Sequence, residues 1–188
     1  MKRNFKACYE FFDKAFQIRK NNIAPDEEMR MNNLITTKIE VLMAERTPES
    51  IKEAEKEVEK LDKTIEKYLK DENPNFLKYN QYSICNHMFK ARFAAMRQEK
   101  EECIWLHLET IELVKEGTAD QNSPMLFPFY QTCISDFKDI GEDKLSSQFN
   151  HQLVESVTRV FGTDNIFYLG YSFDYLAQMM QENFNLGF

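Results

Sequence analysis

The chain has 188 residues and a formal net charge of −7, so it is long enough for one domain with an ordinary core or for a short run of repeats. Only five Gly and five Pro occur, which leaves little turn material for a β-sandwich or barrel. The acidic balance argues against binding to nucleic acid or anionic lipid. Because there is neither a long apolar run nor a signal peptide, we expect no membrane association and a cytoplasmic protein.

Hydrophobic periodicity predicts a succession of amphipathic helices. Taken in chain order, they are expected at 2–21, 26–46, 48–71, 75–98, 100–117, 124–140, 142–161 and 164–184. Proline begins several of these helices, because a first-turn residue needs no amide donor. The sequence also predicts N-caps at Thr47, Asn73, Ser123 and Asp164 and C-terminal glycines at Gly117, Gly141 and Gly162.

The stretch 49–72 is dense in Glu and Lys but keeps an apolar stripe at steps of three and four residues. We interpret it as a helix that packs along one seam and exposes its charges to solvent, rather than as a coiled coil. Cysteines stand far apart within helical patterns, which predicts reduced, buried thiols. They are Cys8, Cys85, Cys103 and Cys133.

Helix openings near 26, 75, 124 and 164 recur at intervals of roughly 40 to 50 residues, a period typical of stacked helical hairpins. Two stretches carry a more specific spacing of large and small residues. Ile166, Leu169, Gly170 and Phe173 match the first-helix pattern of the tetratricopeptide repeat (TPR) family, and Cys8, Phe12 and Ala15 match its second-helix pattern. The chain therefore resembles TPR-like helical repeats, and Gly170 would be the small residue that lets two helices pack closely.

The resemblance implies an all-α fold: a right-handed α-solenoid of about four antiparallel hairpins, forming a single TPR-like domain over 1–188. It also implies a concave groove, lined by first helices, that binds a peptide or helix of a partner protein. The candidate partner-binding residues are Arg30, Asn33, Thr37, Lys78, Tyr82, Asn86, Phe127, Tyr130 and Tyr171. Because the first and last helices carry the patterns of half-hairpins, we expect a fragment of a larger protein, or end helices that pair with a partner.

The sequence favours neither a metal site nor catalysis. Cys85 and His87 diverge on a helix, while Cys103 and His107 share a face but lack further ligands. His151 is interpreted as a surface or partly buried histidine rather than a catalytic base, and no phosphate-binding loop or nucleophile motif occurs. We therefore expect no enzyme activity, no metal and no cofactor. Two alternatives to a protein-interaction scaffold remain: a regulatory helical domain of an enzyme or peptide-sensing transcription regulator, and a closed bundle with an apolar ligand pocket.

Overall fold

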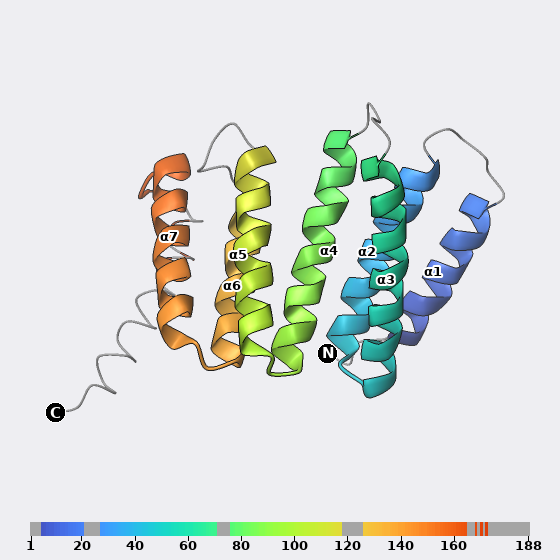
Figure 1. The fold of residues 1–188 in the computed structure, drawn as a ribbon, viewed down its shortest axis with the longest axis horizontal. Helices are drawn as coiled ribbons and strands as arrows, with labels where there is room; N and C mark the ends of the chain where they lie inside the picture. The colour runs from blue at the N-terminus through green and yellow to red at the C-terminus, as the bar shows by residue number, and fades with distance from the viewer. Residues whose placement is uncertain are drawn as a thin grey trace. The chain divides into compact units, whose positions relative to one another are not determined.

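The computed structural model describes residues 5–20, 27–70, 76–117 and 126–164, together with positions 168, 170 and 172. Over these residues the protein is all-helical, with no strand (Figure 1). The helices are α1 (Phe5–Lys20), α2 (Glu27–Glu45), α3 (Pro48–Lys70), α4 (Phe76–Met96), α5 (Lys100–Gly117), α6 (Phe127–Asp139) and α7 (Asp143–Phe161).

These seven helices confirm seven of the eight predicted segments, with bounds that differ by a few residues. The eighth, 164–184, falls almost wholly outside the described residues, as do Ile166, Leu169 and Phe173. Gly170 is described as helical and exposed, and a Cβ added to it would meet none of the described atoms within 4 Å. The structure therefore gives no support to the close helix approach predicted at Gly170.

The turn from α2 to α3 is fixed by a reciprocal cap. The Thr47 hydroxyl accepts the Ser50 backbone N–H at 3.1 Å, and the Ser50 hydroxyl oxygen accepts the Thr47 N–H at 3.0 Å. Such a pair satisfies amide donors that the first turn of a helix leaves without intrahelical partners. The predicted N-cap at Thr47 is confirmed, with Ser50 in the place that Glu or Gln usually takes.

Two of the predicted glycines end helices in the left-handed conformation. Gly141 has φ +74° and Gly162 has φ +75°, a region that costs glycine little because it has no Cβ. Arg46 and Gln98 reach similar angles, φ 59° and 61°, without being glycines. Neither position carries the glycine or asparagine from which a left-handed turn would be predicted.

The chain divides into two compact units, Met1–Asn86 and His87–Phe188, and each is described by itself. In the first unit, α2 packs against both α1 and α3. The α3 stripe predicted from the sequence supplies Ala54, Val58, Leu61 and Ile65 to the core, all of them buried. Burial of this stripe against Ile39, Leu42 and Met43 of α2 is the main apolar contribution to the hairpin.

In the second unit, α6 packs against α7 and also contacts α5. Aromatic rings fill the seam between α6 and α7: Phe137 lies 5.3 Å from Phe149 between ring centroids, and Tyr130 lies 5.9 Å from the same ring. Phe149, Leu153 and Val157 of α7 are buried. Tilted aromatic pairs of this kind add to the stability that area burial alone provides.

Replacing Thr47 with Ala should lower the free energy of unfolding by about 1 kcal/mol, because the Ser50 amide then loses its acceptor. Chemical denaturation by urea, followed by circular dichroism, measures the change. Thr64→Ala is the matched control, since the Thr64 hydroxyl donates to the Lys60 carbonyl within α3 and caps no helix end. Equal effects of the two substitutions would show that the cap contributes nothing specific.

Candidate functional site

The structure brings three of the predicted binding residues together in the first unit. Asn33 and Thr37 are exposed on α2, one helical turn apart. The Tyr82 hydroxyl of α4 donates to the Asn33 side-chain oxygen at 2.9 Å, and the Thr37 hydroxyl donates to the Asn33 backbone oxygen at 2.8 Å. This polar stripe, defined as Asn33, Thr37 and Tyr82, therefore spans α2 and α4. Tyr82 is itself buried, and its hydroxyl orients the side-chain amide of the exposed Asn33.

The other predicted residues are placed differently. Asn86 is 1% exposed, and its amide nitrogen donates to the Asp62 carboxylate of α3. Phe127 and Tyr130 are buried in the second unit, where Phe127 contacts the Phe161 ring. These three side chains pack helices together and do not form an exposed binding surface. The side chains of Arg30, Lys78 and Tyr171 lie outside the described residues.

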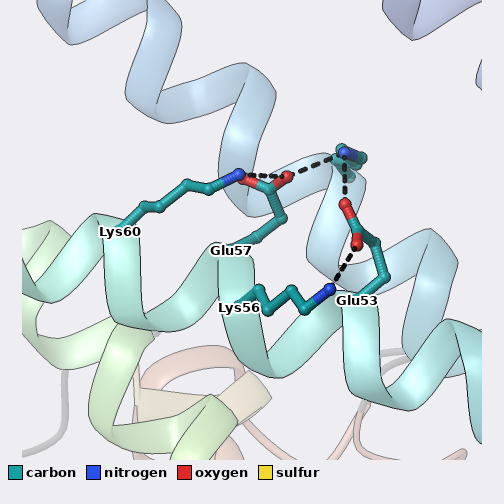
Figure 2. Close-up of polar contacts among 5 residues, drawn as sticks. Glu53, Lys56, Glu57 and Lys60 are labelled. Carbon is teal, nitrogen blue, oxygen red and sulfur yellow. Dashed lines mark hydrogen bonds and ion pairs between the residues drawn. The ribbon is translucent and has the colours of Figure 1, made fainter.

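A cluster of ion pairs joins α2 to the charged stretch of α3. The Lys38 ammonium lies 2.8 Å from a Glu57 carboxylate oxygen, which also accepts from Lys60 at 3.0 Å. Figure 2 shows Glu53, Lys56, Glu57 and Lys60 along the helix. The Glu57 side chain is only 8% exposed, so the expectation that all the charges of 49–72 are solvated is wrong at this residue. An almost buried carboxylate is tolerated because two ammonium groups neutralise it.

The pKa values in this cluster follow from opposing effects. Burial by itself raises the pKa of Glu57, but hydrogen bonds and charges from Lys38 and Lys60 outweigh it and leave that pKa below its ordinary value. Burial likewise lowers the pKa of Lys38, yet the hydrogen bond and charge of Glu57 leave it raised. Both groups are therefore ionised in the folded protein at neutral pH.

A pocket of about 380 Å³ opens where α1, α2 and α3 meet in the first unit. Its wall combines rings, an aliphatic side chain and charged groups: Tyr9, Phe12, Asp13, Lys38, Leu42, Glu45, Glu49 and Glu53. The Tyr9 hydroxyl donates to the Glu45 carboxylate, and burial together with this bond raises the pKa of Tyr9. The sequence analysis missed this pocket, because its wall draws on three helices whose spatial proximity no local pattern encodes.

The second unit contains a buried polar cluster that the sequence analysis also missed. His107 Nε2 on α5 lies 2.9 Å from Asp136 Oδ2 on α6, and both side chains are almost fully buried. Arg92 Nε on α4 lies 3.9 Å from Asp136 Oδ1, close enough for ionic attraction but too far for a hydrogen bond. Two local signals pointed toward it: His107 shares a helix face with Cys103, and Asp136 follows Cys133 by three residues on the buried face of α6.

The cysteines partly match the prediction. None of the four forms a disulfide, and Cys103 and Cys133 are buried as expected. Burial raises the pKa of the Cys103 thiol to about 12 and that of Cys85 to about 11, so both are protonated and unreactive at neutral pH. Cys8 is exposed, so the prediction of a buried thiol is wrong there, because Cys8 lies on the solvent side of α1.

His151 is exposed beside Glu155 on α7, which confirms its interpretation as a surface histidine. Within the described ranges, no three His, Cys, Asp or Glu residues lie close enough to hold a metal ion. Among the same residues, no helix combines the length and apolar character needed to cross a membrane.

No known protein family, curated protein or solved structure matches this chain.

Glu57→Gln should destabilise the protein at neutral pH and progressively less in acid. A lowered pKa means that the ionised form of Glu57 is favoured by folding; its contribution is complete above the ordinary pKa of 4.5 and is lost as the pH falls through the folded value. Urea denaturation over a pH series should therefore show the two stability curves converging below pH 4.5. Glu59→Gln, at an exposed position of α3, is the control; a constant difference between wild type and Glu57→Gln at all pH values would contradict the assignment.

His107→Leu should lower the free energy of unfolding by about 3 kcal/mol, because the buried Asp136 carboxylate loses its hydrogen bond to the His107 ring at 2.9 Å. Urea denaturation followed by circular dichroism measures the loss. His151→Leu, which changes an exposed histidine of the same unit, is the matched control and should alter stability by less than about 0.5 kcal/mol. Similar values for both variants would show that the buried pair contributes no net stability.

Proposed function

We propose that this protein is a protein-interaction module: one TPR-like domain, a right-handed α-solenoid of about four antiparallel helix hairpins, whose concave groove binds a peptide or helix. Support comes from the short turns at 46–47 and 140–142, each of which joins two packed helices. Short helix connections of this kind make neighbouring helices antiparallel. In the proposed array, the first helix of each hairpin, such as α2 in the first unit, contributes to the groove.

The polar stripe of Asn33, Thr37 and Tyr82 is the observation that carries the proposal. Tyr82 engages the side-chain oxygen of Asn33, and this bond orients the amide NH₂ as a donor on an exposed helix face. A primary amide held in this way suits the backbone carbonyl of an extended peptide. Because Tyr82 is already held in the folded unit, little side-chain entropy is lost when a peptide binds.

The alternative of a closed bundle with an apolar ligand pocket receives no specific support. The pocket between α1, α2 and α3 has carboxylates and Lys38 in its wall beside the two rings. An apolar ligand would have to desolvate these charged groups without forming hydrogen bonds to them. Binding of a polar peptide chain is therefore the function that the described residues favour.

A phage-displayed library of random linear peptides, selected against the intact chain, tests the proposal. We expect enriched peptides whose affinity falls about five- to tenfold with Asn33→Ala, because one oriented hydrogen bond is lost. Gln148→Ala, which truncates an exposed amide on α7, is the matched control and should leave affinity unchanged. Failure to enrich any peptide, or enriched peptides that are equally sensitive to the two substitutions, would overturn the proposed groove.

A further inference from the structure

The pocket between α1, α2 and α3 has the chemistry of a site for an organic cation. We propose that it binds an ammonium or guanidinium group carried on an aliphatic stem, as in a lysine or arginine side chain or a free alkylamine. Its volume of about 380 Å³ lies near the lower end of the range for small-ligand pockets, so it suits a ligand the size of one side chain.

The charges of the wall favour a cation. Asp13, Glu45, Glu49 and Glu53 contribute four carboxylates, whereas Lys38 is the one ammonium among the wall residues. Lys38 is itself held by Glu57 at 2.8 Å and by Glu53 at 3.5 Å. Its charge is thus largely compensated by α3, and the remaining carboxylates give the pocket a negative potential.

The apolar part of the wall fits the stem and the face of such a cation. Tyr9 and Phe12 lie three residues apart, on one side of α1, and Leu42 contributes from α2. Aromatic faces attract ammonium and guanidinium groups, and apolar side chains cover the methylene stem that follows. A pocket with rings as well as carboxylates therefore distinguishes an organic cation from a small hydrated ion.

A metal ion is the competing occupant for a group of carboxylates, and the geometry does not favour it. Tight binding of Ca²⁺ needs six or more oxygen ligands converging within about 2.6 Å. Among the described residues, no group of three or more potential ligands is close enough to do this. Glu45 in addition accepts a hydrogen bond from the neutral Tyr9 hydroxyl, which fixes it at the pocket wall.

The pocket is separate from the proposed peptide groove. Successive residues turn by about 100° around a helix, so Lys38, Leu42 and Glu45 of the pocket lie on a different side of α2 from Asn33 and Thr37. Occupation of the pocket therefore does not depend on the polar stripe. The proposed cation site and the proposed peptide groove can be tested independently of each other.

Isothermal titration calorimetry of the intact chain with n-butylguanidinium tests the site. We expect a Kd on the order of 1 mM, as for a ligand with few atoms. Butylurea, a neutral molecule of nearly the same shape, should bind at least about tenfold more weakly, and added salt should weaken n-butylguanidinium binding. Comparing n-butylguanidinium with a blocked Gly-Arg-Gly peptide identifies the source: tighter peptide binding indicates a residue of a partner, and equal binding indicates a free cation.

Two matched variants locate the binding. Glu45→Gln keeps an acceptor for Tyr9 but removes the charge, and it should weaken n-butylguanidinium binding about fivefold. Glu59→Gln on the exposed face of α3 and Asn33→Ala in the polar stripe should leave it unchanged. Butylurea that binds as tightly as n-butylguanidinium, or equal affinities for Glu45→Gln and wild type, would overturn the proposal; loss of binding with Asn33→Ala would assign the cation to the groove instead.

Discussion

The pairing of Lys38 with Glu57 is the interaction on which the first unit depends. It joins α2 to α3 through a contact of 2.8 Å and places an almost buried carboxylate in the seam of the hairpin. A buried charge without a partner would cost several kcal/mol, so the contacts with Lys38 and Lys60 are what allow Glu57 to lie in this seam. Apolar burial provides most of the driving force for packing, while the ion pairs select which packing forms.

The same pairing shapes the surface beside it. Lys38 belongs to the pocket wall, and its bonds to Glu53 and Glu57 direct its charge toward α3. The carboxylates of Asp13, Glu45 and Glu49 then dominate the pocket. The Lys38 ammonium therefore contributes both to the stability of the hairpin and to the charge of the pocket. A change at Glu57 would also alter the electrostatic potential inside the pocket.

The second unit also has a buried polar pair between two helices, formed by different side chains. His107 and Asp136 form a buried contact between α5 and α6, and the Phe137 and His107 rings form a T-shaped pair with centroids 5.3 Å apart. Hydrogen bonding between buried polar groups is directional, whereas apolar contacts are not. The polar pair therefore fixes the alignment of two helices whose apolar faces could pack in several registers.

The sequence by itself determined the helices, because periodicity, N-caps such as Thr47 and left-handed glycines such as Gly141 act within one turn of the chain. The family resemblance also placed Asn33 and Thr37 among the candidate binding residues, and the structure shows both exposed on α2. Only the tertiary structure decided that Glu57 is buried, that Asp136 contacts His107 and that residues of three helices line an open pocket. These features join residues far apart in the chain, and no local spacing encodes which helix faces meet.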